Sequence, residues 1–106
     1  MKSGESEEML ADKSANMVVR QEVANLTNQR ISHILAPKHD WNRVVPVPVN
    51  WGEVSVLMSE VLDEGTEGPY SRVFFKILVV AGQTVEVTYA KLASGIKISD
   101  AWVRDC

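Results

Sequence analysis

The residues best suited to chemistry are the adjacent pair Lys38 and His39, in the segment Pro-Lys-His-Asp-Trp. A histidine titrates near neutral pH, so it can accept or donate a proton, and a neighbouring lysine can neutralise a phosphate. Taken alone, a histidine in a linker is usually a surface residue. The apolar residues on either side, Ile34 and Trp41, favour a docked segment that holds the His39 ring in place.

Asp100 and Trp102 form a second candidate group near the end of the chain. Asp100 interrupts an apolar alternation between Ile98 and Trp102, and a carboxylate there needs a partner or solvent. Two interpretations are evenly balanced: the strand leaves the core at Asp100, or Asp100 belongs to a site. Trp102 can stack on a nucleobase, although an isolated strand tryptophan is more often a core residue. Together with Lys38-His39, these residues could make a small, metal-free site for cutting RNA.

The remaining histidine and the cysteine point away from metal chemistry. His33 and His39 are six residues apart, which would not place them on the same side of one helix, so the spacing does not indicate metal ligands. His33 is expected at a helix surface. The single Cys106 excludes an internal disulfide and a cysteine-based zinc site. The sequence also lacks a glycine-rich phosphate loop and a nucleophile elbow, so the chemistry is expected to need no cofactor.

Two helices are expected ahead of the strands. Residues 14–36 show helical periodicity and are followed by a proline, which predicts one long helix. A linker over residues 37–49 should be extended at its Val-Pro-Val-Pro-Val stretch, because proline biases the preceding residue away from helix. Asn50 and Glu53 form a capping box that begins the second helix, and Gly65 ends it.

Three strands, at about 71–80, 84–92 and 96–104, follow a turn at Gly68-Pro69. Short loops between them predict an antiparallel meander, and the order of elements predicts an α+β fold with N-terminal helices packed on that sheet. Strict alternation would put one apolar set on one side of the last strand: Ile96, Ile98, Asp100 and Trp102. The opposite set is expected to face solvent or a cleft: Glu86, Thr88, Ala90, Lys97, Ser99 and Ala101. Thr88, Tyr89 and Lys91, near the end of the middle strand, either bind phosphate or solvate an edge.

The composition is that of one globular domain with an acidic balance. The 106 residues carry a net charge of −3 and a pI near 5.3. This balance counts against a general nucleic-acid binder, but a local basic cleft is compatible with it, because Lys97 and other cations lie away from the acidic segments. We expect residues 1–13 to be a flexible acidic lead-in and residues 14–106 to be the single domain. There is no signal-peptide pattern and no apolar run long enough to span a membrane.

Three segments resemble one family of toxins. They are Ile-Leu-Ala-Pro-Lys-His-Asp-Trp, Gly-Gln-Thr-Val-Glu-Val and Gly-Ile-Lys-Ile-Ser-Asp-Ala-Trp-Val. With the order of helices and strands, they are similar to the C-terminal toxin domain of contact-dependent growth inhibition and related polymorphic toxins. These domains belong to the barnase/EndoU/colicin/RelE-like group of ribonucleases. The resemblance covers about residues 30–104.

The resemblance implies a tRNA-cleaving toxin that a cognate immunity protein neutralises. It would be delivered from a secreted or cell-surface carrier and act in the cytoplasm of the target cell, where a host protein cofactor is a further partner that the resemblance allows. The colicin D type of site has a histidine preceded by lysine, which Lys38-His39 matches. It also has a serine two residues before a tryptophan, where this chain has Asp100 before Trp102. Ser99 would lie on the opposite face from Asp100 and could replace it only through a β-bulge.

Under this resemblance, His39 is a general base or acid and Lys38 stabilises charge on the phosphate. Trp102 stacks a base, and Asp100 orients His39 or a ribose hydroxyl. Arg43 and Lys91 are weaker phosphate-binding candidates. The alternative, which the acidic charge favours, is a non-enzymatic α+β interaction module, an adaptor or immunity-type protein that binds through its acidic helix.

Overall fold

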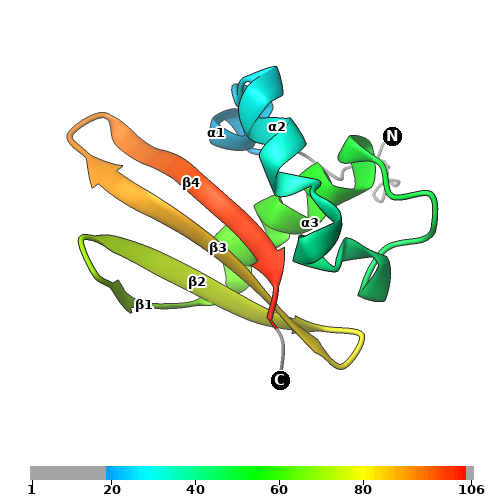
Figure 1. Ribbon diagram of the computed structural model, residues 1–106. Coiled ribbons are helices and arrows are strands. Elements are labelled where there is room, and N and C mark those ends of the chain that lie inside the picture. The colour runs from blue at the N-terminus through cyan, green and yellow to red at the C-terminus, as the bar shows by residue number, and fades with distance from the viewer. Residues whose placement is uncertain (1–18, 105–106) are drawn as a thin grey trace, which may run out of the picture.

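The computed structural model describes residues 19–104, an α+β fold in which helices pack against a four-stranded antiparallel sheet (Figure 1). The helices are α1 (Gln21–Ala24), α2 (Asn28–Ile34), the short 3-10 helices η2 (Pro37–His39) and η3 (Trp41–Arg43), and α3 (Trp51–Glu64). The strands β1 (Thr66–Tyr70), β2 (Val73–Val80), β3 (Gln83–Leu92) and β4 (Gly95–Val103) lie side by side in this order. The predicted fold class is confirmed. The expected lead-in over residues 1–13 and Cys106 lie outside the described residues.

The helices pack against β2, β3 and β4. α3 packs against β2 and β3, whereas α1 and α2 lie alongside β4 (Figure 1). Within residues 19–104, none of these helices combines the length and the apolar character that a membrane span requires.

The helix α3 agrees with its sequence signals. The Asn50 side chain accepts a hydrogen bond from the Glu53 backbone N–H at 3.0 Å, as a capping box requires. The Glu53 carboxylate lies 3.4 Å from the Asn50 side-chain nitrogen, and the helix ends at Glu64, next to Gly65. Its buried apolar stripe consists of Val54, Leu57, Met58, Val61 and Leu62. Burial of this apolar stripe holds α3 against the sheet.

The single helix predicted over residues 14–36 is wrong in its described part. α1 ends at Ala24, and Thr27 begins α2 by accepting a hydrogen bond from the Arg30 backbone N–H at 3.1 Å. A threonine hydroxyl that caps a new helix competes with continuation of the previous one. The linker over 37–49 is likewise not extended throughout, because it contains η2 and η3.

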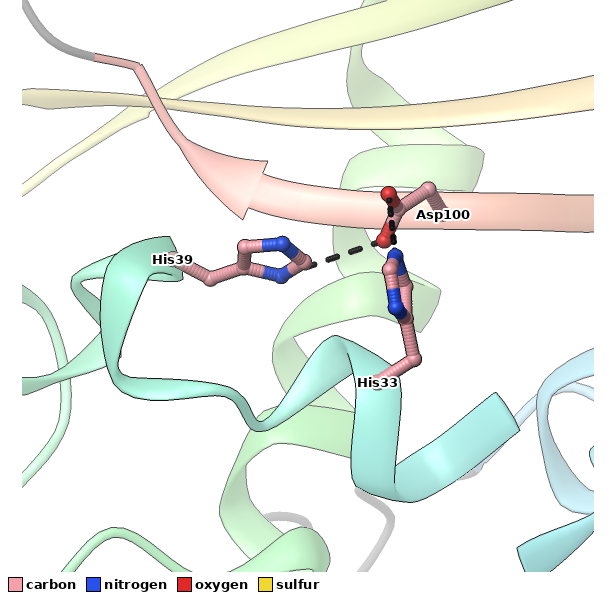
Figure 2. Close-up of side chains that lie close together, drawn as sticks. All are labelled: His33, His39 and Asp100. Carbon is pink, nitrogen blue, oxygen red and sulfur yellow. Dashed lines mark hydrogen bonds and ion pairs between the residues drawn. The ribbon is translucent and has the colours of Figure 1, made fainter. Parts of the chain in front are cut away.

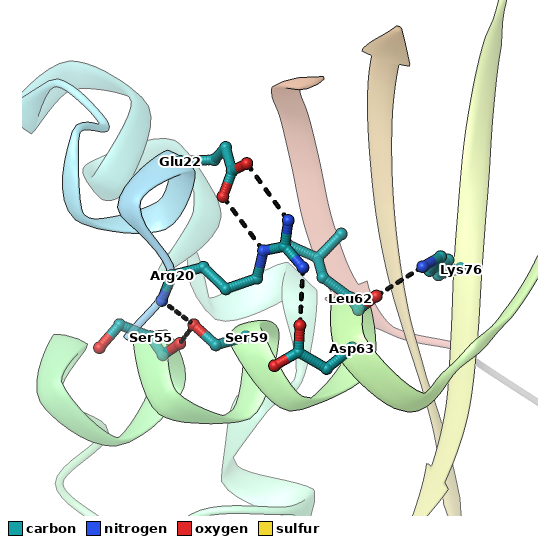
Figure 3. Close-up of polar contacts among 7 residues, drawn as sticks. All are labelled: Arg20, Glu22, Ser55, Ser59, Leu62, Asp63 and Lys76. Carbon is teal, nitrogen blue, oxygen red and sulfur yellow. Dashed lines mark hydrogen bonds and ion pairs between the residues drawn. The ribbon is translucent and has the colours of Figure 1, made fainter. Parts of the chain in front are cut away.

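Arg20 fastens the first helices to α3 (Figure 3). Its guanidinium lies 3.1 Å from the Glu22 carboxylate and 2.6 Å from that of Asp63. Lys76 of β2 donates to a backbone carbonyl in the last turn of α3. Both cations lie near the C-terminal end of α3, where the helix dipole favours positive charge. They therefore offset the acidic residues that the sequence places there.

The strand β1 was missed, since Gly68-Pro69 predicted a turn and the turn lies at residues 71–72 instead. β1 is an edge strand, which tolerates a proline because one side of its backbone needs no partner. Gly68 pairs with Phe75, and a Cβ at residue 68 would lie 2.4 Å from the Phe75 ring. The glycine is therefore explained by the aromatic ring that packs over it.

A β-bulge divides β4 into two parts. Ile98 pairs with Tyr89, and Asp100 pairs with the adjacent residue Thr88. Two steps along β4 thus oppose one step along β3, so Ser99 is the extra residue.

The bulge reverses the faces of the residues that follow it. Ala101 and Val103 continue the buried surface of Ile98, with exposed fractions of 0%, 3% and 4% respectively. Asp100 and Trp102 therefore alternate with the core residues instead of joining them. The predicted shared side of Ile98, Asp100 and Trp102 is wrong, and so is the placement of Ala101 on the polar side.

Glu86, expected to face solvent or a cleft, is almost completely buried. It pairs with Trp102 across the sheet, and its carboxylate lies 2.8 Å from the Arg104 guanidinium. Burial raises the pKa of the Glu86 carboxyl, and the Arg104 charge opposes part of that rise. Folding therefore favours the protonated form of Glu86.

We expect Glu86→Gln to gain stability relative to the native chain as the pH rises from acidic to neutral. A raised carboxyl pKa in the folded state means that native stability falls as the pH rises through the ordinary glutamate range. The neutral glutamine lacks this loss, so the difference in unfolding free energy grows with pH. Urea unfolding of both proteins across this pH range measures it. A difference that stayed constant or shrank would contradict the assignment.

Candidate active site

The short helix η2 holds His39 in a fixed orientation. Pro37 stands at its start, and Asp40 follows it in a left-handed conformation with φ of 60°, so the chain turns sharply around the histidine. His39 as a whole residue is 6% exposed, and its Nδ1 lies 2.8 Å from the Ile34 carbonyl oxygen. Trp41 Nε1 donates to the same carbonyl at 2.7 Å. The docked segment predicted from Ile34 and Trp41 is confirmed.

The Ile34 carbonyl also fixes the tautomer of His39. A carbonyl oxygen only accepts hydrogen bonds, so Nδ1 carries the hydrogen at this contact. In neutral His39 the lone pair then lies on Nε2. His39 is thus prepared to accept a proton at Nε2.

Three titratable side chains meet beside β4: His33 of α2, His39 of η2 and Asp100 of β4 (Figure 2). His33 Nε2 lies 3.1 Å from Asp100 Oδ2, and His39 Nδ1 lies 3.8 Å from Asp100 Oδ1. The two imidazole rings are 5.3 Å apart between centroids, in an edge-to-face arrangement. We call these residues the His–His–Asp cluster.

His33 is the functional candidate that the sequence argument did not select. Its side chain is 43% exposed, in agreement with the predicted surface position. The spacing placed His33 and His39 on different sides on the assumption of one continuous helix, whereas the two rings meet. α2 ends at Ile34, and the turn at Pro37 brings His39 back towards His33. Two histidines on either side of a proline are the signal that could have indicated this convergence.

Trp102 and Lys38 flank the cluster. The Trp102 ring lies 6.3 Å from that of His39, tilted by 59°, and it is half-buried on the face opposite the core. Lys38 is exposed and directly precedes His39. An aromatic ring therefore lies near the groups that can transfer protons, and a lysine adjoins them in sequence.

Asp100 has a second hydrogen bond that fixes its carboxylate. Its Oδ1 accepts from the Ala101 backbone N–H at 2.8 Å, and its backbone carbonyl lies 3.4 Å from the Thr88 hydroxyl. Thr88 is buried, so the structure places it beside Asp100 as part of the sheet and not on an exposed phosphate site.

Tyr89 and Lys91 belong to a different cluster, centred on Glu67 of β1. The Tyr89 hydroxyl donates to the Glu67 carboxylate, and Lys91 Nζ lies 2.9 Å from it. Burial and the hydrogen bond to Glu67 raise the pKa of Tyr89, while Lys91 and Tyr89 lower the pKa of Glu67. The structure does not bring these two residues to the His–His–Asp cluster. Arg43 is exposed in η3, the segment that follows η2.

The His–His–Asp cluster is also the group of described residues in which three ligand atoms come close enough to hold a metal ion. Those atoms all lie within 4.8 Å of one another. To bind a metal through Nδ1, His39 would have to leave the Ile34 carbonyl, which would keep its hydrogen bond from Trp41. As described, His39 Nδ1 is committed to a carbonyl, which leaves Nε2 as the ring nitrogen that can accept a proton or bind a metal ion.

Comparison with protein families gives a match that covers most of the described chain. The family model described as bacterial toxin 35 matches residues 26–103, a span that contains every member of the His–His–Asp cluster together with Lys38 and Trp102. No curated protein and no solved structure is significantly similar to the chain.

Proposed function

The chain belongs to the bacterial toxin 35 family, and on this premise we propose that it is an antibacterial toxin domain that cleaves tRNA as a metal-independent ribonuclease. The observation that carries the proposal is the convergence of His33, His39 and Asp100. Two imidazoles and a carboxylate are sufficient for acid–base cleavage of RNA, because the nucleophile is the substrate's own 2′-hydroxyl.

In the proposed reaction, His39 Nε2 removes the proton of the 2′-hydroxyl. The 2′-oxygen then bonds to the adjacent phosphorus, and the bond from phosphorus to the 5′-oxygen breaks. Protonated His33 donates to Asp100 through Nε2, so its Nδ1 hydrogen is available for the departing 5′-oxygen. The products are a 2′,3′-cyclic phosphate and a 5′-hydroxyl.

The neighbouring residues have supporting roles in this proposal. Lys38 neutralises charge that develops on the phosphate oxygens, and Trp102 stacks a base next to the scissile bond. Asp100 holds His33 by a direct contact and lies close to His39. A carboxylate accepts from His33 Nε2 and also places its negative charge 3.8 Å from His39 Nδ1, which a serine or threonine hydroxyl could not do. The difference from the colicin D type of site is thereby explained by a different partner, His33.

The choice of tRNA and the biological setting rest on the resemblance described above. We propose that a cognate immunity protein covers the His–His–Asp cluster. We further propose delivery from a secreted or cell-surface carrier into the target-cell cytoplasm, with a host protein as a further partner to be tested. Membership of a toxin family favours this function over an adaptor or immunity-type module that binds through α3.

We expect the purified chain to cleave total tRNA in the presence of excess EDTA. The proposed proton transfers use side chains alone, so removal of divalent ions should leave the rate unchanged. Analysis of fragment ends on sequencing gels should find cyclic phosphates and 5′-hydroxyls. Intact tRNA, or cleavage that EDTA stops and a divalent ion restores, would refute the proposed reaction.

A further inference from the structure

A groove of about 580 Å³ lies between the first helices and β4. Its helical wall comes from α1, α2 and the turn between them, and its other wall comes from the first half of β4 and the turn before it (Figure 1). Polar and apolar side chains both line it: Asn25, Leu26, Thr27, Ser94, Ile96 and Ile98. The groove is therefore suited to a ligand with both polar and apolar parts.

Two cations give this groove a positive character. Arg30 of α2 and Lys97 of β4 both line it and are exposed, and among residues 19–104 neither side chain has an ion-pair partner. The acidic residue in the lining, Glu22, is paired with Arg20 at 3.1 Å (Figure 3). The two unpaired cations are thus the charges that an incoming ligand would meet.

Both walls of the groove continue along the chain towards the His–His–Asp cluster. Arg30 precedes His33 by three residues on α2, so the two side chains lie on one side of the helix, about one turn apart. On the other wall, Lys97 pairs with Ala90, and Asp100 pairs with Thr88 two positions along β3. An RNA strand with its scissile phosphate at the cluster would therefore carry its neighbouring phosphates into the groove.

We propose that this groove is the RNA-binding subsite of the enzyme, and that Arg30 and Lys97 contact phosphates next to the scissile bond. The identity of the ligand rests on the proposed ribonuclease function. The subsite explains how an acidic protein can bind RNA: two cations without ion-pair partners among residues 19–104 line the approach to the cluster, while the acidic residues of α3 lie elsewhere.

Binding can be measured without cleavage by using a short single-stranded 2′-O-methyl RNA, which lacks the nucleophilic hydroxyl. We expect Arg30→Gln and Lys97→Gln each to weaken binding and to lower the slope of log affinity against log salt by about 0.7, the value for one lost phosphate contact on a single strand. The matched control is Arg72→Gln, which removes an exposed cation between β1 and β2, at the sheet edge opposite β4.

Cleavage of unmodified tRNA gives a second measurement. Both groove variants should raise KM severalfold with little change in kcat, because they do not touch the reacting atoms. The proposed subsite would be overturned if affinity and salt slope were unchanged in the groove variants, or if Arg72→Gln lost as much affinity as they do. Either result would count even if the native chain cleaves RNA. Conversely, groove-dependent binding by a chain that cleaves nothing would support the subsite and refute the ribonuclease.

Discussion

Replacing His39 with alanine is expected to reduce tRNA cleavage by about 10²–10⁴-fold, the range for loss of a general base or acid. The variant loses the one imidazole whose tautomer is set by the Ile34 carbonyl. The fold should survive, because Trp41 still donates to that carbonyl. Initial rates on total tRNA, with a thermal unfolding curve for each protein, measure both effects.

Trp41→Phe is the matched control for His39→Ala. It removes the other hydrogen bond to the Ile34 carbonyl but leaves both histidines and Asp100 in place. We expect it to lower stability more than cleavage, the reverse of the His39 variant. Undiminished cleavage by a folded His39→Ala protein would reject His39 as a catalytic residue.

The second large effect is expected from Asp100→Asn, which should lower kcat by roughly 10²-fold or more. The amide keeps the shape of the side chain and can still accept the Ala101 hydrogen bond at Oδ1. It loses the negative charge that faces His33 Nε2 at 3.1 Å. Protonated His33, the proposed proton donor, then lacks both its counter-charge and the contact that holds its ring in position. Because Asp100 acts through His33, the double variant with His33→Ala should be little slower than the slower single variant.

Asp63→Asn provides the same chemical change at an exposed carboxylate that contacts Arg20. We expect it to leave kcat unchanged, which separates the role of Asp100 from a general effect of charge. The pH–rate profile adds a further test. The native chain should show a bell-shaped dependence of rate on pH, as expected when a base and an acid act together, and Asp100→Asn should lower the rate across the profile. Fully additive losses in the double variant would mean that Asp100 and His33 work independently.

The sequence predicted those elements whose signals are local. Asn50 and Glu53 cap α3 as expected, and β2, β3 and β4 begin and end within a residue or two of their predicted bounds. The docking of His39 was also predictable, because the apolar residues that surround it lie within the same short segment.

The missed features depend on contacts between distant parts of the chain. β1 contains a glycine and a proline, and only the ring of Phe75 and an edge position explain them. His33 joins the site through Asp100, which is 67 residues away. No periodicity in α2 indicates that contact. The alternation of apolar and polar residues likewise does not predict the bulge at Ser99, because alternation assumes that each residue of β4 has one partner in β3.

The extra residue in β4 makes the length of this strand as important as its composition. Loss of a single codon at position 99 would join Ile98 directly to Asp100, and strict alternation would then keep Asp100 and Trp102 on the side opposite Ile98, where they lie now. One further residue between Ser99 and Asp100 that paired regularly would instead reverse the sides of Asp100, Ala101 and Trp102. Substitution of Ser99 by another residue would keep the count and hence the orientation. Evolution of this chain should therefore tolerate exchange or loss of the bulge residue while it selects against an insertion beside it.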